Sequence, residues 1–460
     1  MQKPRLLLAG AHSGAGKTSV AAGIMAALVR RGLTIQPYKV GPDYIDPAFH
    51  TFVTGRQSRN LDSWLMDQPT TLALFGHSAP GPGEGLSIIE GVMGLFDGHS
   101  REAVGSSAHL ARILDAPVVL VINGAGLARS AAALVKGFDL FEPGLRLSGV
   151  IINQTSSPAH YEMLKEFVEK EAGVPSFGHL LKNQSLALES RHLGLVPAGE
   201  VADLSAKLGR LAEAAAETLD LDGLIKLAQT APEMEIPPLS LPATTLRPRV
   251  RLGLARDAAF NFYYQDGLDL LVRLGAELAP FSPLADASLP PDLAGLYVGG
   301  GFPEVFAAEL AANHKLKGEI RKALEDGLPA YAECGGLMFL AQTLVDKDGR
   351  AHEMAGFFPV TTVMGPRLSN FGYATAVFEA PTVLGPAGTR VRVHEFHHSR
   401  IEAEKPEDYV LRIEKSPART WRGGLARKNV LAAYPHLHFA ANPALAANFL
   451  EACRREKKCI

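Results

Sequence analysis

Short apolar segments alternate with longer amphipathic ones through the first half of the chain. The apolar segments lie at residues 5–9, 87–90, 118–122 and 149–152, and a helical pattern over 19–31 follows the first of them. Apolar runs of this length are typical of strands that are buried on both faces. Because they alternate with helices, we expect a parallel sheet covered by helices.

The second half shows the same alternation. It predicts strands at 251–255, 295–298 and 330–332 and helices at 265–274 and 337–344, followed by irregular and β-rich structure from 353 to 413. Between the halves, residues 231–248 are rich in proline and lack a periodic pattern. This favours a linker, because proline fits neither sheet ladders nor helix interiors. We therefore expect two α/β domains, 1–232 and 249–450, joined by a linker at 233–248.

Composition narrows the range of partners. The 460 residues suffice for two to three domains, and 47% of them are hydrophobic. With 46 Lys and Arg against 48 Asp and Glu, neither nucleic acid nor an anionic membrane is expected as a partner. No apolar run approaches the ~18 residues that a membrane-spanning helix needs, and the start lacks a signal-peptide pattern. The three cysteines, Cys334, Cys453 and Cys459, are too few for a disulfide framework and fit a reducing cytoplasm.

A glycine-rich turn follows the first predicted strand, in the sequence LLLAGAHSGAGKTSVAAGI. Backbone N–H groups of such a turn and of a helix start form a cradle for anions. In this pattern Lys17 reaches the outer phosphates of a nucleotide and the Thr18 hydroxyl binds Mg²⁺. Ala11 stands where the strict pattern has its first glycine, and an ordinary strand-to-helix turn is the alternative. We expect ATP to be bound by Gly14, Gly16, Lys17, Thr18 and Ser19.

Carboxylates follow two of the predicted strands. KVGPDYIDP places Asp43, Tyr44 and Asp46 after a strand at 36–40, and EGVMGLFDG places Glu90 at a strand end and Asp97 in the loop beyond it. Ligands of open α/β sheets bind beyond the carboxyl ends of the strands, and Mg²⁺ prefers carboxylate oxygens. We expect metal ligands in Thr18, Asp43 and Glu90, and substrate contacts from Asp43, Tyr44, Asp46 and Asp97. Which of Asp43 and Asp46 binds the metal stays open, and solvated or helix-capping carboxylates are the alternative.

A predicted strand runs directly into Cys334, two glycines and a helix in GLPAYAECGGLMFLAQTL. This order outlines a nucleophile elbow, in which a sharp turn exposes the thiol and the helix N-terminus favours the thiolate. N–H groups of Gly335, and of Gly301 in GLYVGGGFPE, can stabilise an oxyanion. His436 and His438, in AAYPHLHF, are candidate bases for the cysteine. The alternative for Cys334 is a small buried hydrophobic residue.

Two further motifs have open roles. VHEFHHS contains His394, His397 and His398 and could form a metal site, although it lacks a matching carboxylate or cysteine cluster. RDAAFNFYY, at 256–264, is aromatic and could line a substrate or a domain interface, or simply belong to the core.

The motifs together resemble the cobyrinic acid a,c-diamide synthase family over nearly the whole chain. They are the phosphate loop, KVGPDYIDP, EGVMGLFDG, RHLGL, RDAAFNFYY, GGGFPE, AECGGLM and HLHF, in this order. The resemblance implies an N-terminal half similar to the dethiobiotin-synthetase-like P-loop synthases. It also implies a C-terminal half similar to class I glutamine amidotransferase domains of the cobyric-acid-synthase type.

The resemblance also implies roles for the candidate residues. Cys334 matches the nucleophile and His436, rather than His438, matches its partner. Other class I relatives carry a glutamate two residues after this histidine; His438 stands there, so a dyad is expected. Pro435, before the histidine, departs from the apolar residue expected at that place.

The activity implied by the resemblance is amidation of the a- and c-side-chain carboxylates of cobyrinate, with ATP, Mg²⁺ and L-glutamine, in cobalamin biosynthesis. Glutamine would supply ammonia, and ATP would activate the carboxylate as an acyl phosphate. Hydrogenobyrinate or nickel sirohydrochlorin could be the acceptor instead, and a P-loop ATPase scaffold with an inactive glutaminase-like module is an alternative of another class. A homodimer is left open.

Overall fold

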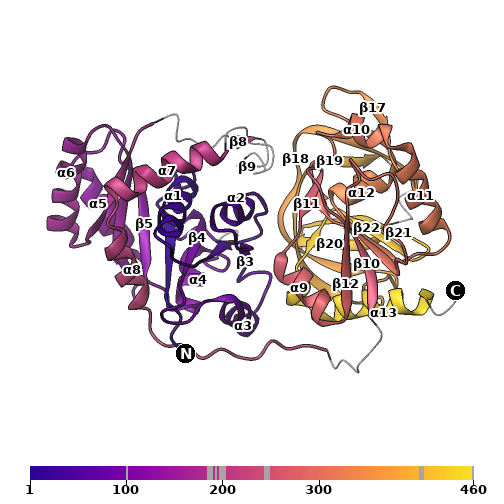
Figure 1. The fold of residues 1–460 in the computed structure, drawn as a ribbon, viewed down its shortest axis with the longest axis horizontal. Helices are drawn as coiled ribbons and strands as arrows, with labels where there is room; N and C mark the ends of the chain where they lie inside the picture. Colours follow the sequence, from indigo (N-terminus) through magenta and orange to yellow (C-terminus); the bar gives the residue numbers. More distant parts are fainter. Residues whose placement is uncertain are drawn as a thin grey trace. The chain divides into compact units, whose positions relative to one another are not determined.

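The computed structural model describes residues 1–99, 102–183, 190–191, 194–195, 204–242, 249–402 and 409–457. The chain forms two compact units, Met1–Leu239 and Ser240–Ile460 (Figure 1). Each unit has its own hydrophobic core. The division falls inside the segment 233–248 that the sequence marks as a linker.

The N-terminal unit is built on a seven-stranded parallel sheet. In spatial order its strands are β3 (Arg59–Leu61), β2 (Ile35–Val40), β4 (Leu86–Gly94), β1 (Arg5–Gly10), β5 (Val118–Asn123), β6 (Leu147–Thr155) and β7 (Ser176–Leu181). Every residue of β1 is buried, as expected for a central strand covered on both faces. One prediction was wrong: Glu90 does not end its strand but lies inside β4, between Leu8 of β1 and Lys39 of β2.

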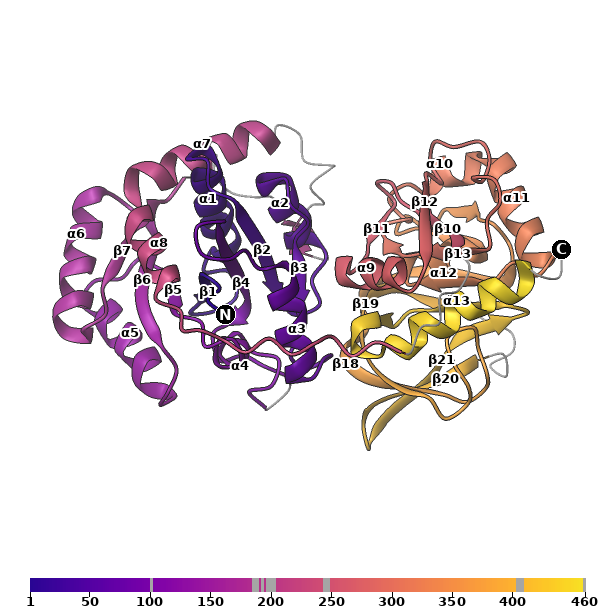
Figure 2. The ribbon, with the colours of Figure 1, turned by 60° about the horizontal axis from the view of Figure 1, so that its bottom comes forward.

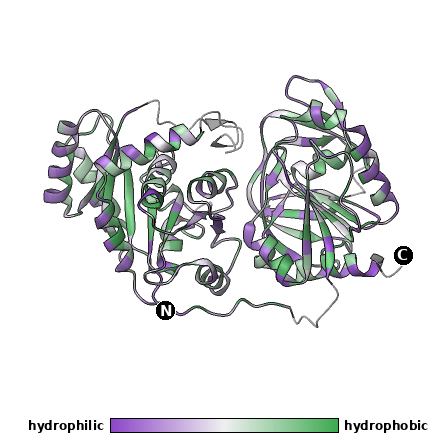
Figure 3. Ribbon diagram, in the orientation of Figure 1, coloured by the Kyte–Doolittle hydropathy of each residue, from purple (hydrophilic) through white to green (hydrophobic). Residues whose placement is uncertain are grey.

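Helices cover both faces of this sheet (Figure 2). They are α1 (Lys17–Arg30), α2 (Ile45–Thr54), α3 (Gln68–Ser78), α4 (Ser107–Ile113), α5 (Ser130–Phe141), α6 (Pro158–Phe167), the π-helical η1 (Val168–Ala172), α7 (Leu204–Thr218) and α8 (Leu221–Gln229). Apolar residues concentrate on the strands and polar residues on the outer faces of the helices (Figure 3). Two short strands, β8 (Ser190–Arg191) and β9 (Gly194–Leu195), pair with each other, whereas residues 192–193 of the RHLGL motif lie outside the described residues.

Arg5 of β1 binds the segment that follows α8, the last helix of this unit. Its fully buried guanidinium donates to the carbonyl oxygens of Leu114 at 2.6 Å and of Pro232 at 3.0 Å. Met1 and Met234 exchange backbone hydrogen bonds of 2.8 and 3.0 Å beside it. A buried charge of this kind is tolerated only when its donors are satisfied, so the carbonyl of Pro232 belongs to the fold of the N-terminal unit.

The segment that follows also contacts this unit at first. The Ile236 side chain packs on α3, where a methyl group on Gly76 would come within 2.4 Å of it. Residues 243–248 of the expected linker lie outside the described residues.

The C-terminal unit is built on a larger mixed sheet. Its path runs through β12 (Ala276–Phe281), β10 (Val250–Ala255), β13 (Gly295–Val298), β15 (Ala330–Glu333), β22 (Val430–Ala433), β21 (Arg419–Arg427), β20 (Tyr409–Ser416), β18 (Phe358–Phe378), β16 (Ala341–Val345) and β17 (Ala351–Glu353). The first five strands of this path are parallel, and β22, β21, β20 and β18 continue it antiparallel. β19 (Arg390–Glu402) pairs with both β18 and β23 (His436–Leu437), and β11 (Phe260–Phe262) pairs with β14 (Gly300–Gly301).

The helices of this unit are α9 (Gln265–Arg273), α10 (Ala307–Ala312), α11 (His314–Glu325), α12 (Gly335–Leu340), the 3₁₀-helical η5 (Phe439–Ala441) and α13 (Pro443–Lys457). The helix predicted over 337–344 was therefore wrong in its second half. α12 ends at Leu340 and the chain continues as β16, because residues 341–345 pair in parallel with β18. Tertiary pairing overrides local helix preference in such a segment. The β-rich character expected from 353 to 413 is confirmed by β17 to β20.

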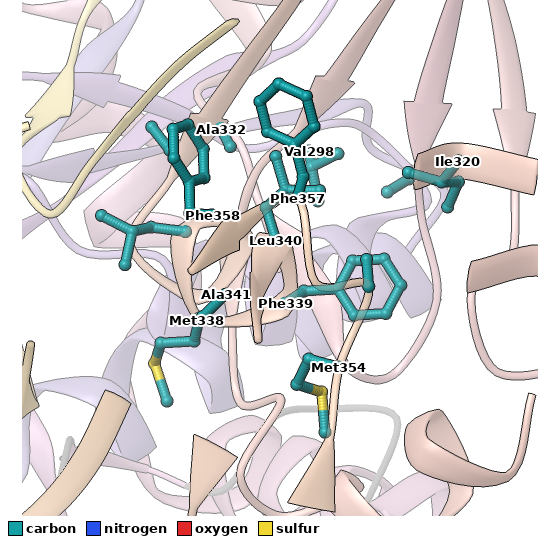
Figure 4. Close-up of a cluster of buried hydrophobic side chains, with 14 of the residues drawn as sticks. Val298, Ile320, Ala332, Met338, Phe339, Leu340, Ala341, Met354, Phe357 and Phe358 are labelled. Atoms are coloured by element: carbon teal, nitrogen blue, oxygen red, sulfur yellow. The ribbon is translucent and has the colours of Figure 1, made fainter. Parts of the chain in front are cut away.

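A dense apolar cluster lies around α12 (Figure 4). Leu337, Phe339 and Leu340 of α12 pack there with Val298 of β13 and Ala332 of β15, all nearly or fully buried. This packing holds α12 in place together with β13 and β15, the two strands that the glycine-rich turns follow. Within the described residues, no helix is both long and apolar enough to cross a membrane.

Candidate active site

The glycine-rich turn of the N-terminal unit joins β1 to α1, as the sequence predicts. Gly14 and Gly16 have φ values of 83° and 90°, which favour glycine. Asn153 of β6 holds the turn, since its Nδ2 donates to the Ala15 carbonyl at 3.0 Å. A methyl group on Gly16 would lie 2.0 Å from the same Nδ2. Asn153 was missed at the sequence level, because nothing local links it to a turn so distant in the chain.

Lys17 begins α1 and folds back over the turn. The residue is 8% exposed, and its ammonium donates to the Met93 carbonyl at 2.5 Å. Met93 has φ 46°, an uncommon value for a residue with a side chain. Burial, and next the positive charge of Lys39, lower the pKa of Lys17. The lysine therefore holds a charge that is poorly solvated without a phosphate, as suits an anion-binding group.

Four of the predicted residues, Thr18, Asp43, Asp46 and Glu90, lie around Lys39, which was not predicted. Thr18 Oγ1 donates to Glu90 Oε1 at 2.7 Å and lies 3.4 Å from Asp46 Oδ2. The Lys39 ammonium lies 2.5 Å from Asp46 Oδ2, 3.0 Å from Glu90 Oε1 and 4.0 Å from Asp43 Oδ2. We call Thr18, Lys39, Asp43, Asp46 and Glu90 the acidic cluster.

Glu90 has a second buried partner. His50 Nε2 lies 2.6 Å from Glu90 Oε2, both side chains are fully buried, and His50 Nδ1 lies 3.3 Å from Ser58 Oγ. A histidine in this position orients the carboxylate and leaves Oε1 to face Thr18 and Lys39. His50 was not predicted, because a single histidine inside α2 carries no motif.

The acidic cluster has more negative than positive charge. Burial would raise the pKa of Glu90, but Lys39 and His50 hold that pKa well below its usual range. Burial, Asp43 and Glu90 together raise the pKa of Asp46 well above its usual value. Although burial alone would lower it, Asp46, Glu90 and Asp43 raise the pKa of Lys39 above its usual value. One lysine thus cannot neutralise three carboxylates, and a further cation would relieve the excess.

The donor set suits Mg²⁺, which prefers hydroxyl and carboxylate oxygens. Thr18 Oγ1, Asp46 Oδ2 and Glu90 Oε1 converge on one point, at present beside the Lys39 ammonium. Asp43 is less available, since its Oδ1 accepts from the backbone N–H groups of Ile45 at 2.8 Å and of Asp46 at 3.3 Å. Across the residues that the structure describes, His, Cys, Asp and Glu side chains nowhere form a three-ligand metal group by themselves.

The other expected substrate contacts have local structural partners. Asp97 Oδ2 accepts from the Gly94 N–H at 2.9 Å and so closes the turn after β4. Tyr44 is half-buried at the start of α2. Ser19, expected at the nucleotide, lies in the first turn of α1.

In the C-terminal unit, Cys334 occupies the sharp turn between β15 and α12. It has φ 46° and ψ −99°, and its backbone N–H donates to the Ala433 carbonyl of β22 at 2.8 Å. A non-glycine residue in this conformation is strained by about 1–3 kcal/mol, and such strain is typical of functional turns. The structure therefore has the elbow that the sequence predicts.

Two glycine-rich turns meet beside the cysteine. A methyl group on Gly335 would come within 3.1 Å of Gly301 N, and one on Gly336 would lie 2.2 Å from the Val298 carbonyl. Gly301 also pairs with Phe260 of β11 and has φ 156°. The two expected sources of oxyanion N–H groups thus lie close to each other.

The thiol is not activated in advance. Burial, followed by the negative charge of Glu304, raises the pKa of Cys334 well above its usual value, and the Gly335 N–H only partly opposes this. Burial of the sulfur thus outweighs the effect of the N-terminus of α12, which was expected to favour a thiolate. Attack by this thiol therefore needs a base that takes its proton as the reaction proceeds.

The two candidate bases differ in their surroundings. His436 lies on β23, and a methyl group on Gly300 would come within 2.7 Å of its Cε1. Its Nδ1 lies 3.7 Å from Glu333 Oε2. His438 is fully buried and stacks on Tyr264, with ring centroids 4.6 Å apart. Burial lowers the pKa of His438 to about 4, so it is a poor proton acceptor near neutral pH, which favours His436.

The VHEFHHS segment forms part of β19. Its Glu395 and His397 are buried and lie 3.3 Å apart, and His397 stacks on Tyr434 with ring centroids 3.9 Å apart. Burial lowers the pKa of His394 to about 3. Among the described residues these side chains do not gather into a metal site.

The fold and the two sites define a class of protein: a P-loop nucleotide-binding unit joined to a glutamine amidotransferase unit. Residues 6–196 match the family described as the CobQ/CobB/MinD/ParA nucleotide binding domain. Residues 251–444 match the CobB/CobQ-like glutamine amidotransferase domain. A solved structure described as a glutamine amidotransferase aligns with 44% of this chain and 98% of its own, at 19% identity and a TM-score of 0.33.

Relatives match over the full length. Cobyrinate a,c-diamide synthase of Dehalococcoides mccartyi (strain ATCC BAA-2266 / KCTC 15142 / 195) is 42% identical over 456 residues, 98% of each chain. The proteins of the same name from Streptococcus sanguinis and Priestia megaterium are 44% and 40% identical, covering 97% and 100% of this chain and 98% and 99% of their own. The chain belongs to the cobyrinate a,c-diamide synthase family, and the resemblance seen in its motifs is confirmed.

Proposed function

We propose that this chain uses ATP and glutamine to amidate the a- and c-side-chain carboxylates of cobyrinate, a step of cobalamin biosynthesis. The observation that carries the proposal is full-length similarity to synthases of that name, at 42% identity over 98% of the chain. The phosphate loop with its acidic cluster and the Cys334 elbow supply the two chemistries that such an amidation needs. We assign the ATP-dependent step to residues 1–232, extended by residues 233–239 of the expected linker 233–248, which pack on the same unit, and the glutaminase to 249–450.

In the glutaminase, the Cys334 sulfur attacks the side-chain amide carbon of glutamine. The thiol proton passes to His436, a C–S bond forms, and the amide oxygen gains negative charge beside the N–H groups of Gly301 and Gly335. His436 returns the proton to the amide nitrogen, the C–N bond breaks, and ammonia leaves. Water then hydrolyses the thioester to glutamate. Because burial raises the pKa of Cys334, this reaction depends on His436 as a base.

In the synthetase, Gly14, Gly16 and Ser19 surround the phosphates, and Lys17 exchanges its contact with the Met93 carbonyl for a phosphate oxygen. The acceptor carboxylate attacks the γ-phosphoryl group, the bond to the bridging oxygen breaks and ADP leaves. Ammonia then attacks the acyl phosphate, phosphate leaves, and the nitrogen loses a proton as the amide forms. Such transfers depend mainly on positioning and on neutralised charge.

Thr18, Asp46 and Glu90 would hold Mg²⁺, with Asp46 favoured over Asp43 because Asp46 Oδ2 lies 3.4 Å from Thr18 Oγ1, whereas Asp43 Oδ1 accepts from backbone N–H groups. The ion, when bound, would neutralise charge on the phosphates. Lys39, freed from Asp46, could then pair with the acceptor carboxylate. Tyr44, Asp43 and Asp97 stay candidates for acceptor contacts, and a homodimer stays a prediction. We also propose a cytoplasmic location, where ATP is available and free thiols persist.

The test is an acceptor panel. Purified protein is incubated with MgATP, glutamine and cobyrinate, hydrogenobyrinate or nickel sirohydrochlorin, and each amide-for-acid change is followed by mass spectrometry. Two changes on cobyrinate support the proposal, whereas amidation of only another tetrapyrrole would reassign the substrate. No glutamate release under any condition would favour an ATPase scaffold with an inactive glutaminase.

A further inference from the structure

Glu333, the residue before the nucleophile, has its carboxylate beside the candidate base. It is 1% exposed, and its Oε2 lies 3.7 Å from His436 Nδ1. The family resemblance suggests a dyad, because His438 occupies the place where other class I enzymes carry a glutamate. The structure brings in a carboxylate from a different element, the end of β15.

The Glu333 carboxylate is held firmly in this position. Its Oε1 accepts from the Tyr331 hydroxyl at 2.6 Å and from the Leu437 N–H at 3.1 Å. Its Oε2 accepts from the Tyr297 hydroxyl at 3.3 Å and faces the imidazole. Because Leu437 follows His436 directly, the same carboxylate binds both the backbone and the side-chain region of β23.

The tyrosines act as donors over the whole working range of pH. Burial, and next the Glu333 charge, raise the pKa of Tyr297 and of Tyr331 well above the usual value. The pair of hydroxyls and the backbone N–H thus solvate a carboxylate that is cut off from water. A buried carboxylate that accepts three hydrogen bonds in this way is held in place to act on a neighbouring imidazole.

We propose that Glu333 is the third member of the glutaminase site, a positioning residue that orients His436 through Nδ1 and stabilises its protonated form. This rests on the proposed glutaminase activity. When the Cys334 proton reaches His436, the new imidazolium faces the carboxylate, as in other nucleophile–histidine–acid sites. The resting distance exceeds a hydrogen bond, and contacts of this kind commonly shorten once substrate binds.

The main test is Glu333→Gln in the full chain. The amide keeps an acceptor for Tyr331 but removes the charge, so kcat for glutamate release should fall on the order of 10²-fold or more, while KM for glutamine changes little. The acidic limb of the kcat/KM profile should move about one unit to lower pH, because His436 loses the charge that favours its protonation. Amidation with ammonium salts should persist.

Tyr331→Phe provides a matched second variant. It keeps the Glu333 charge but removes a 2.6 Å hydrogen bond, which makes the carboxylate a stronger acceptor for the imidazolium. The acidic limb should therefore move to higher pH, opposite to Glu333→Gln. If Glu333 has a purely structural role, the acidic limb should move in neither variant, or in the same direction in both. Either result would overturn the proposal.

The outcomes separate this proposal from the function on which it rests. If the unmodified protein releases no glutamate from glutamine, the proposed function fails. If it is active and Glu333→Gln keeps kcat within twofold with an unshifted pH profile, the role of Glu333 alone is refuted. Should Glu333→Gln fail to fold, the direction of the Tyr331→Phe shift decides.

Discussion

Replacing Lys39 by methionine should destabilise the N-terminal unit strongly. Methionine fills most of the volume, but the buried Asp46 and Glu90 lose the ammonium that lies 2.5 and 3.0 Å away. Removing one partner of a buried ion pair costs about 3–5 kcal/mol. For a unit of this size that corresponds to a Tm lower by roughly 6–20 °C.

The loss should depend on pH and on Mg²⁺. In Lys39→Met the unpaired carboxylates have raised pKa values in the folded state, so the destabilisation is full at neutral pH and shrinks as the pH falls through those values. Mg²⁺ can take over the charge of the missing ammonium. It should therefore raise the Tm of the variant more than that of the unmodified protein.

Calorimetry of the full chain, with and without metal, measures these effects, and Lys17→Met is the matched control. Lys17 is also buried, but its ammonium donates to a carbonyl oxygen, that of Met93, and its pKa is lowered by burial. Its removal should cost at most about 1 kcal/mol while ATP turnover is lost. A Lys39→Met variant that melts within about 2 °C of the unmodified protein without metal, or an equal loss of stability in both lysine variants, would contradict the charge-pairing role of Lys39.

Three further predictions concern the glutaminase. Cys334→Ser should abolish glutamine-dependent amidation while ammonia-dependent amidation survives; loss of both in a folded protein would contradict the division of labour. Gly300→Ala puts a methyl group 2.7 Å from His436 Cε1, so glutamate release should fall roughly 10-fold or more at little cost in Tm; an unchanged rate would argue against His436. Alkylation of Cys334 by iodoacetamide, followed by intact mass, should be slow at neutral pH and still accelerate above pH 9.0, because burial raises its pKa beyond that value; fast alkylation at neutral pH would show that the thiol is already activated.

Much of the fold was predictable because buried parallel strands and glycine-rich turns are local patterns. The apolar run at 5–9 became β1, and the GKT sequence became the start of α1. The elbow at Cys334 was predictable for the same reason, since strand, cysteine, glycines and helix are contiguous.

The site residues and the helix end that were not predicted from the sequence depend on contacts between distant segments. Lys39 and His50 lie on β2 and α2 and meet Glu90 of β4 only through the order of the sheet. Glu333 is adjacent to Cys334, yet its partner His436 arrives from β23 about a hundred residues later. The end of α12 was misplaced because β18, which captures the following residues as β16, comes later in the chain.

The buried guanidinium of Arg5 has a practical consequence for dividing this enzyme into two separately produced chains. A cut at 232/233 would turn the carbonyl that Arg5 binds into a charged terminus and remove the partner of Met1. A cut between Leu239 and Ser240 preserves both, together with Ile236 on α3. The synthetase half made with that later boundary should fold and accept ammonia by itself, whereas the shorter piece should aggregate or melt early.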